Sequence, residues 1–476
     1  MKRSYLSFCI FYSLNALSKG DLPNVVFILA DDLGYNDVSF YRNLNFSEPY
    51  DGIPTSQTPN IDKLAKEGIA FTDFYCGAAV SSPSRAALLT GRNHTRLGIY
   101  NWIPSDSPMH LLTEEYTIAE LMKDKGYSTA HFGKWHLSSS GMGHPIPNNH
   151  GFDYSYFTHT DEKLKHFNPN CYFRNGVPVG KQKGYACNLM VDEAIGWLEK
   201  RKTTEPFFIN LWFNEPHFPL AAPDSLTKRH DYNSLYYGAI ENMDLSIGRF
   251  MEYLKLKKMD DNTIVFFASD NGADINHSND PYRLGKCFLY EGGVRIPFIV
   301  KWKNRVSKGQ VSSYNGIFED IIVTLSHLIG QKLPEDRVYD GEDLTKVIID
   351  GNNICYRKKD VFFHRYFQDP MCMLREGEWV LLGYYNEIIP IEEDHKLGLA
   401  LTAVKRATHS EWGFNEEHMQ MLKKMRPRYY SLYNLKKDRE QKRDLSNFYP
   451  EIVKRLKRKM LIRLEEELNE GPNWFE

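Results

Sequence analysis

The chain has 476 residues, of which 42% are hydrophobic and 25% are charged, and its formal net charge is −2. This length is sufficient for one large hydrophobic core and a second, smaller one. The nearly balanced charge argues against a general nucleic-acid-binding protein, because such proteins carry an excess of Lys and Arg. The composition is that of an ordinary globular protein, and we expect no nucleic-acid partner.

The N-terminal segment predicts export. Lys2 and Arg3 precede an apolar stretch from Tyr5 to Leu17, and Ala16-Leu17-Ser18 resembles a signal-peptide cleavage site. The stretch is short and interrupted by Ser and Asn, so we expect no stable membrane insertion. We predict that residues 1–18 are a signal peptide and that the chain is exported. Its destination would be the periplasm or the medium, or the lysosome or extracellular space in a eukaryote.

Cysteine usage does not indicate a disulfide scaffold. Six cysteines remain after residue 18, which is few for a chain of this length. Cys171 and Cys187 bracket a turn-rich loop, and they are the best candidates for a single disulfide.

Strand-like and helical segments alternate from Val25 to about Gly330. Continuous apolar runs typical of buried parallel strands cover 25–30, 127–132, 207–213 and 263–269, and helical segments ending in Gly cover 60–68 and 117–126. This alternation predicts an α/β fold with a large, mostly parallel sheet sandwiched by helices. We assign this large domain to residues 19–355.

The pattern changes from about Asp360. Short strands are expected at 371–375, 378–384 and 430–435, followed by a helix near 449–468. We predict a smaller C-terminal α+β domain, residues 356–476, with an antiparallel sheet covered by one helix.

The run Ser81-Ser82-Pro83-Ser84-Arg85, followed by Ala86-Ala87-Leu88-Leu89-Thr90-Gly91-Arg92, predicts a helix with an anion site at its start. Ser82 suits the N-cap and Pro83 the first helical position, while Gly91 suits the end. Free backbone N–H groups and Arg85 would then face a sulfate or phosphate, with Ser81 at the lip. The alternative is an ordinary capped helix.

Two predicted strands end in acidic pairs. Asp31 and Asp32 follow the run 25–30, and Asp270 and Asn271 follow the run 263–269. Strand ends of open α/β sheets are where ligands bind. Three carboxylates and an amide suit a hard cation such as Ca²⁺ better than zinc. Either pair alone could simply cap a turn.

The run from Ser81 to Arg92 resembles the signature of the sulfatase family, Cys/Ser-x-Pro-Ser-Arg followed by an apolar stretch and Thr-Gly-Arg. In that family the first residue is oxidised to formylglycine, and its hydrated aldehyde is the nucleophile. Here that residue is Ser81, so the resemblance implies a maturation enzyme that acts on serine. Cys76 lacks the following proline and arginine, and it is not the converted residue.

Basic residues also match the family's segments in order along the chain. Lys134 and His136 lie in Gly-Lys-Trp-His, His217 lies in Pro-His-x-Pro, and Lys286 precedes Glu-Gly-Gly. The resemblance implies that Arg85 and Lys134 steady the modified residue and that His136 assists sulfate elimination. It further implies that His217 and Lys286 bind sulfate and protonate the leaving oxygen.

The resemblance covers nearly the whole mature chain and implies an alkaline-phosphatase-like fold. It also implies one Ca²⁺ per chain, held by Asp31, Asp32, Asp270 and Asn271, and a formylglycine derived from Ser81. The resulting hypothesis is a sulfatase acting on a sulfate ester. The alternatives are a formylglycine phosphodiesterase or phosphonate hydrolase of the same fold, or an inactive glycan-binding relative. A two-zinc phosphatase would want additional His ligands.

Export and abundant aromatic residues favour a sulfated saccharide as the substrate. Four residues are candidates for the rim of the substrate pocket: His150, Asp153, His364 and Arg365. The last two come from the segment where the second domain begins, and an Arg fork suits carboxylate or sulfate groups.

Overall fold

The computed structural model describes residues 22–45, 56–159, 165–201, 205–274, 279–351, 356–366, 370–385 and 415–476. The predicted signal peptide, residues 1–18, lies outside these ranges. Residue 355, where we place the end of the large domain, also lies outside them, and that boundary stays a prediction.

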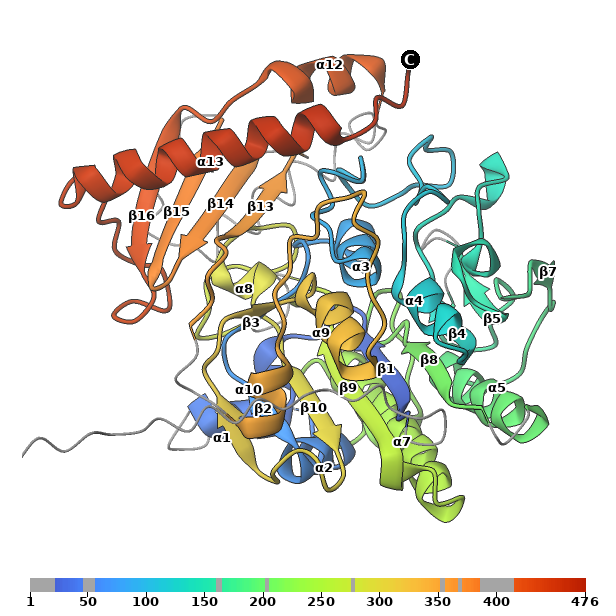
Figure 1. The fold of residues 1–476 in the computed structure, drawn as a ribbon. Helices are drawn as coiled ribbons and strands as arrows, with labels where there is room; N and C mark the ends of the chain where they lie inside the picture. Colours follow the sequence, from blue (N-terminus) through green and yellow to red (C-terminus); the bar gives the residue numbers. More distant parts are fainter. Residues whose placement is uncertain are drawn as a thin grey trace, which may run out of the picture.

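A ten-stranded mixed sheet forms the framework of the large domain (Figure 1), in the order β11-β2-β10-β9-β1-β8-β4-β5-β6-β7. The five strands from β9 to β5 are mutually parallel, and β10 and β6 add to them in antiparallel fashion. This confirms a mixed, mostly parallel sheet. The strands are β1 (Asn24–Ala30), β2 (Ile69–Phe71), β4 (Ser128–Lys134), β5 (Tyr154–Thr158), β6 (Phe173–Arg174), β7 (Val177–Pro178), β8 (Phe207–Trp212), β9 (Thr263–Ser269), β10 (Phe298–Trp302) and β11 (Gln310–Ser312).

Helices cover both faces of this sheet because β1 is apolar on both. Val25, Phe27 and Leu29 belong to one hydrophobic cluster, with α3, α4 and α9, and the alternate residues of β1 belong to another, with α2, α5 and α7. The helices of the large domain are α1 (Ser39–Asn45), α2 (Pro59–Glu67), α3 (Ser81–Thr90), α4 (Ile118–Asp124), α5 (Ala186–Lys200), α6 (Asp224–Thr227), α7 (Ser234–Leu256), α8 (Glu291–Val294), α9 (Asp320–Ile329) and α10 (Thr345–Asp350). A short parallel pair, β3 (Phe74–Tyr75) and β12 (Gly316–Ile317), lies apart from the main sheet.

Local signals set several of these boundaries. Thr117 caps α4 through a capping box with Glu120. Strand β4 runs two residues beyond the predicted end, to Lys134, because Gly133 lets β4 pass close to β8. A Cβ at Gly133 would lie 1.8 Å from the Trp212 carbonyl oxygen, so only glycine fits there. This extension carries Lys134 to the carboxyl edge of the sheet.

The small domain is an antiparallel four-stranded sheet with a long helix across it (Figure 1), as predicted. Its strands pair in chain order, and α13 packs on β13, β14 and β15. The elements are β13 (Val361–Arg365), β14 (Met371–Glu376), β15 (Trp379–Tyr384), α12 (Glu416–Lys424), β16 (Tyr429–Asn434) and α13 (Pro450–Glu470).

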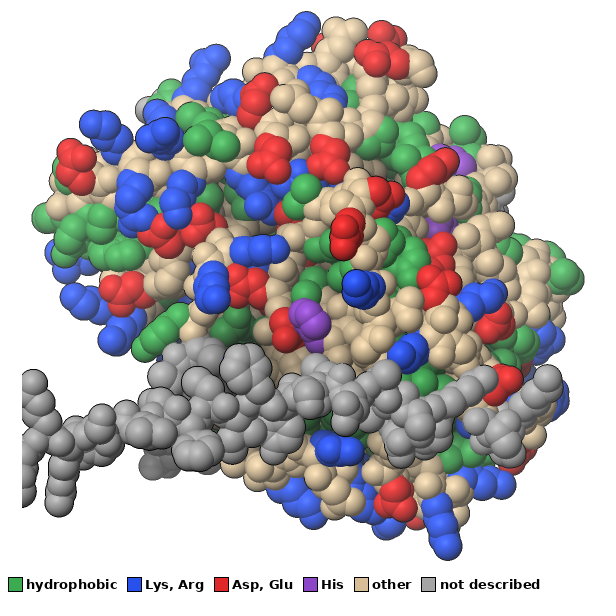
Figure 2. All heavy atoms as spheres, viewed as in Figure 1, with side chains coloured by type: hydrophobic (Ala, Val, Ile, Leu, Met, Phe, Trp, Pro, Cys, Tyr) green, Lys and Arg blue, Asp and Glu red, His purple; other side chains and the backbone are tan. Residues whose placement is uncertain are grey.

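Charged side chains of both signs are interspersed over the face drawn in Figure 2, in keeping with a formal net charge of −2. Among the described residues, every helix is too short or too polar to traverse a lipid bilayer.

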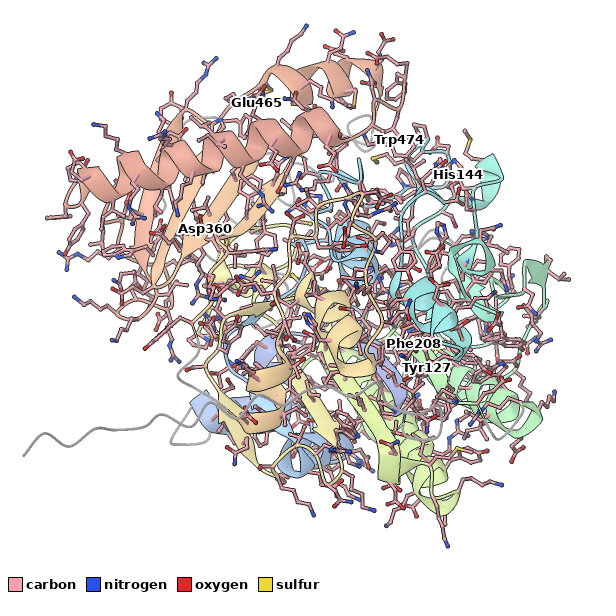
Figure 3. The ribbon with its side chains drawn as sticks, viewed as in Figure 1. Tyr127, His144, Phe208, Asp360, Glu465 and Trp474 are labelled. Carbon is pink, nitrogen blue, oxygen red and sulfur yellow. The ribbon has the colours of Figure 1, made fainter. Side chains whose placement is uncertain are left out.

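The C-terminal segment returns to the large domain beyond α13. The Trp474 indole N–H donates to the Gly98 carbonyl oxygen at 2.7 Å. Its ring lies 5.0 Å from that of His110, which stacks on His144 with 4.2 Å between ring centroids (Figure 3). These contacts join the end of the chain to loops of the large domain.

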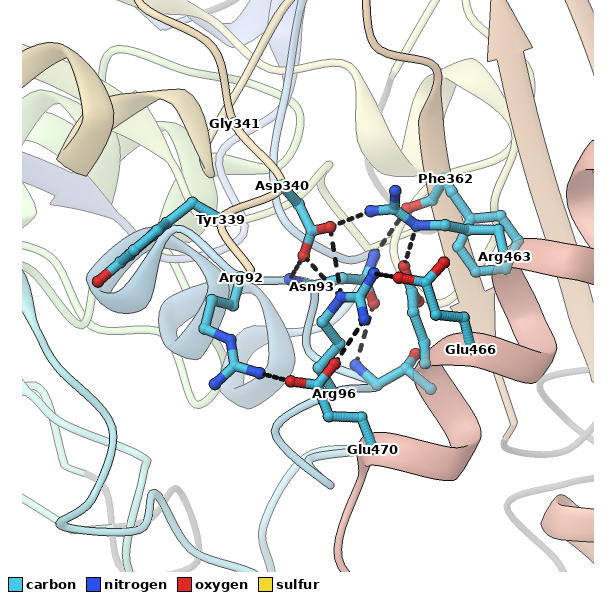
Figure 4. Close-up of polar contacts among 12 residues, drawn as sticks. Arg92, Asn93, Arg96, Tyr339, Asp340, Gly341, Phe362, Arg463, Glu466 and Glu470 are labelled. Atoms are coloured by element: carbon cyan, nitrogen blue, oxygen red, sulfur yellow. Dashed lines mark hydrogen bonds and ion pairs between the residues drawn. The ribbon is translucent and has the colours of Figure 1, made fainter. Parts of the chain in front are cut away.

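An ion-pair cluster joins the two domains where the end of α3 meets the end of α13 (Figure 4). Arg96 pairs with Asp340 at 3.1 Å and with Glu466 at 2.8 Å. Arg92 pairs with Glu470, and Arg463 pairs with Asp340. The small domain is thus fastened to the helix whose other end carries Ser81.

The predicted disulfide between Cys171 and Cys187 is wrong, since both residues are free thiols. The Cys187 sulfur is buried and accepts a hydrogen bond from Asn242 Nδ2 at 3.1 Å. Burial raises the pKa of the Cys187 thiol well above its usual range, which makes it unreactive.

Candidate active site

The functional side chains converge at the carboxyl edge of the sheet because they follow neighbouring parallel strands. Asp31 follows β1, Asp270 follows β9, and Lys134 ends β4. Backbone hydrogen bonds hold these ends together: Asp270 N donates to the Ala30 carbonyl oxygen, and Asp31 N donates to the Glu215 carbonyl oxygen, each at 3.0 Å. Residues far apart in the sequence are thereby fixed in one place.

Helix α3 places Ser81 at its first turn, two residues earlier than predicted. Its N-cap is Val80 and not Ser82, whose hydroxyl instead accepts from Ile103 N at 3.0 Å. Gly91 ends the helix in the left-handed conformation, at φ 69°, as predicted. The N-terminal end of the helix dipole therefore lies at Ser81.

Ser81 is 2% exposed and lies between a carboxylate and an ammonium group. Its hydroxyl donates to Asp31 Oδ1 at 3.2 Å and accepts from Lys134 Nζ at 3.2 Å. Lys134 Nζ also donates to Asp31 Oδ2 at 2.7 Å. A group at position 81 is therefore held by one cation and one anion.

Arg85, one helical turn after Ser81, contacts the carboxylates of Asp31 and Asp270. Its guanidinium donates to Asp270 Oδ2 at 2.9 and 3.1 Å and to the Lys134 carbonyl oxygen at 3.0 Å, and it lies 3.4 Å from Asp31 Oδ1. The side chains of Asp31, Arg85, Lys134 and Asp270 are fully buried, so their charges are paired in a region of low dielectric constant.

Asp32 is the centre of a second set of contacts. Its backbone is left-handed, at φ 62°, a conformation that is uncommon for non-glycine residues. The carboxylate accepts from Asn271 Nδ2 at 2.7 Å and from Lys286 Nζ at 2.6 Å, and His217 Nε2 lies 3.6 Å away. Burial opposes its ionisation, but Lys286 and His217 outweigh burial and hold the pKa of Asp32 below its usual value.

The oxygen atoms of this cluster fit a hard cation. Ligand atoms of Asp31, Asp32 and His217 lie within 4.8 Å of one another. Asp270 Oδ1 joins them by accepting from Asp32 N at 3.1 Å. The buried Asn271 Oδ1 has no hydrogen-bond partner, and an unsatisfied buried oxygen beside carboxylates is a natural cation ligand.

The site opens where His217 and Lys286 lie. Their side chains are 14% and 18% exposed, whereas those of Asp31, Arg85 and Lys134 are 0% exposed. His217 and Lys286 at the mouth, above a buried charged cluster, form a binding place for an anionic group. His136 is buried, two residues beyond Lys134, and has a left-handed backbone with φ 56°.

The other predicted rim residues do not join this cluster. Asp153 directly precedes β5 and lies beside the start of β4, at the opposite end of that strand from Lys134. Its carboxylate accepts from Thr129 N at 3.1 Å. His150 packs in the core, with its ring 5.5 Å from that of Trp135, and burial lowers its pKa to about 4. Both therefore have structural surroundings.

His364 and Arg365 line a small cavity beside α3, together with Val80 and Asn101. His364 is buried, and burial lowers its pKa to about 3, so it is neutral and suited to packing. Arg365 lies over the Phe288 ring at 5.2 Å. Of the two, Arg365 is the one suited to contact an anionic substrate.

Glu215 is a residue that sequence reasoning missed. Its backbone carbonyl binds Asp31 N, and its buried carboxylate accepts from Cys187 N at 3.0 Å, in the first turn of α5. Glu215 thus connects α5 to the end of β1 that carries Asp31. Its place directly before Pro216-His217 is the signal that could have indicated this role.

Comparisons with known proteins agree with this arrangement. The sulfatase family profile matches residues 23–331. N-acetylgalactosamine-6-sulfatase from Rattus norvegicus is 32% identical over 376 residues, covering 72% of this chain and 68% of the relative. Arylsulfatase from Hemicentrotus pulcherrimus is 34% identical over 390 residues, covering 75% and 66%. The solved structure of Ps i-CgsB in complex with k-i-k-neocarrahexaose has a TM-score of 0.76 at 26% identity, covering 94% of this chain and 93% of that chain.

The fold and the charged site together define a hydrolase of anionic esters. Since the family profile covers most of the large domain, the chain belongs to the sulfatase family. It is accordingly a sulfuric ester hydrolase.

Proposed function

We propose that this protein is a calcium-dependent sulfatase that removes sulfate from a carbohydrate by means of a formylglycine made from Ser81. The observation that carries the proposal is the position of Ser81. It lies at the start of a buried helix, in hydrogen-bond contact with both Lys134 and Asp31, and Asp31 in turn belongs to the oxygen cluster.

A calcium ion would be held by four residues whose oxygens meet at the strand ends: Asp31, Asp32, Asp270 and Asn271. The all-oxygen donor set and the unsatisfied Asn271 oxygen support Ca²⁺ over Zn²⁺. When bound, the ion supplies positive charge that offsets the charge on the sulfate oxygens.

Ser81 requires oxidation to act, because the Asp31 carboxylate that accepts its hydrogen bond is paired with Lys134 and Arg85 and would be a weak base, and an unactivated serine is a weak nucleophile. We propose that a maturation enzyme acting on serine performs this oxidation. When present, the hydrated aldehyde supplies the attacking hydroxyl group.

The surrounding side chains would position this group and handle protons. Lys134 Nζ holds the side chain of residue 81, while Arg85 pairs with Asp31 and Asp270 and holds their carboxylates in place. His217 and Lys286, at the mouth, would contact the sulfate and protonate the leaving alcohol oxygen. His136 would assist the release of sulfate from residue 81.

A sulfated saccharide is the substrate class we favour. N-acetylgalactosamine-6-sulfatase and the neocarrahexaose complex of Ps i-CgsB are among the similar proteins, and both names refer to carbohydrates. We propose that Arg365, which lines the small cavity beside α3, contacts a carboxylate or second sulfate of such a substrate. The basic and apolar N-terminal segment supports an exported, secreted or periplasmic enzyme.

The test uses the matured full-length chain, stripped of metal by chelation. Ca²⁺ should restore sulfate release from sulfated oligosaccharides better than Zn²⁺, and should raise the melting temperature. Asp270→Asn should lose both effects. Asp153→Asn is the matched control, because its carboxylate lies at the other end of β4.

Three outcomes would contradict the proposal. Reactivation by Zn²⁺ in preference to Ca²⁺ would refute the metal assignment. Turnover of phosphodiesters or phosphonates with no release from any sulfate ester would favour the phosphodiesterase alternative, and binding of sulfated glycans without turnover would favour an inactive relative.

A further inference from the structure

An exposed aromatic ring stands at the mouth of the active site. Phe218 directly follows His217, one of the two partly exposed cations that mark the opening, and its side chain is 76% exposed. A phenylalanine this exposed contributes little to the packing of the protein. Packing therefore does not account for an exposed ring next to His217.

The backbone that carries this ring is held by the site itself. His217 Nδ1 donates to the Phe218 carbonyl oxygen, and His217 N donates to the Asn214 carbonyl oxygen at 3.0 Å. One residue before His217, in the same loop, lies Pro216, preceded by Glu215, whose carbonyl binds Asp31 N. The loop thus fixes the Phe218 backbone relative to the strand end that carries the proposed metal ligands, and the ring is presented with little loss of backbone entropy on binding.

We propose that Phe218 is a specificity-determining residue whose ring stacks on the sugar ring that carries the sulfate ester. This inference rests on the proposed function. A sugar bound through its sulfate at His217 and Lys286 would extend outward through the mouth, and the exposed Phe218, the next residue to His217, would lie near its path. The apolar C–H face of a pyranose complements a flat aromatic face, and aromatic side chains commonly line such sites.

The expected energetic signature separates ring binding from anion binding. Stacking contributes to binding of the whole saccharide in both the ground state and the transition state, so its loss raises KM with little change in kcat. Inorganic sulfate has no ring, so its affinity as an inhibitor should not depend on Phe218.

The test compares four variants of the matured enzyme on a sulfated oligosaccharide. Phe218→Ala and Phe218→Leu should raise KM about tenfold, whereas Phe218→Trp should keep it near the original value. Inhibition by inorganic sulfate should be the same in all. Phe448→Ala, at a 65% exposed phenylalanine of the small domain, is the matched control and should leave KM unchanged.

An unchanged KM in Phe218→Ala, or equal affinity in the Leu and Trp variants, would overturn the stacking role. A parallel loss of sulfate inhibition would also overturn it, because the change would then act on the anion site. After any of these three results the proposed function would stand. If the unaltered matured enzyme released no sulfate from any saccharide, the proposed function would fail and this inference with it.

Discussion

The sharpest stability prediction concerns Glu467, a fully buried carboxylate in the ion-pair cluster between the two domains (Figure 4). Among the described residues, four arginines of this cluster face six carboxylates: Arg92, Arg96, Arg337 and Arg463 against Glu115, Asp336, Asp340, Glu466, Glu467 and Glu470. Two carboxylates are therefore in excess. Glu467 is the most buried of the six, and its Oε2 atom has no hydrogen-bond partner.

The magnitude follows from the pKa. Burial, aided by the Asp340 carboxylate, raises the pKa of Glu467 from 4.5 to about 8 against the attraction of Arg463 and Arg96. Between these two values the folded protein binds a proton that the unfolded chain does not, so stability is greatest at the acidic end and falls as pH rises. At about 1.4 kcal/mol per pKa unit, the ceiling on this effect is roughly 5 kcal/mol.

The assay is denaturant unfolding followed by tryptophan fluorescence, at about pH 5.5 and about pH 9. Glu467→Gln, which mimics the protonated carboxyl, should exceed the unaltered protein by only about 1.4 kcal/mol at the acidic pH, which is one unit above the unfolded pKa, and by about 3 kcal/mol more at the alkaline pH. Glu466→Gln is the control, because the Glu466 side chain is 50% exposed. The stability difference between this variant and the unaltered protein should be the same at both pH values. If Glu467→Gln and the unaltered protein differ by the same amount at both pH values, the reasoning is refuted.

Two further predictions concern the reaction. His217→Ala and Lys286→Ala should slow hydrolysis of a sugar sulfate more than hydrolysis of an activated aryl sulfate, by about 10²–10⁴-fold, because general-acid help matters most for a basic leaving oxygen. The measurement is steady-state kinetics on both substrates. Equal losses on the two would mean that these residues serve binding alone. Arg365→Ala should raise KM for a sulfated oligosaccharide bearing a second anionic group while sparing a small aryl sulfate, and an unchanged KM on the oligosaccharide would remove Arg365 from the substrate site.

The parts of the fold that sequence reasoning predicted best are those determined by local apolar patterns. Strand β9 has the predicted bounds, and β1 begins one residue early, because both are continuous buried runs. The residues that follow these strands were correctly expected to meet, since parallel strands deliver their ends to one edge. The start of α3 was misplaced because Ser82 and Pro83 satisfy local capping rules, whereas the actual position depends on Ile103 N, which binds the Ser82 hydroxyl.

Other features depend on contacts that no local pattern encodes. Asp153 was a candidate for the rim of the substrate pocket. The parallel pairing of β4 and β5 instead places it beside the start of β4, at the opposite end of the sheet from Lys134. The sequence around Cys187 allows a disulfide, but its sulfur accepts a hydrogen bond from Asn242, which is 55 residues further along the chain on α7. The ion-pair cluster joins Arg92 to Glu470, residues 378 positions apart, so it could not be anticipated from either segment.

The most direct test of the central claim is the mass of the peptide that contains Ser81, measured on protein from its native host together with sulfatase activity. Conversion of serine to the aldehyde removes two hydrogens, so the peptide should be lighter by about 2 Da, and the converted fraction should rise in proportion to activity across preparations. Ser81→Ala should show neither the mass change nor turnover. Full activity in protein whose Ser81 peptide has the unmodified mass would contradict the account.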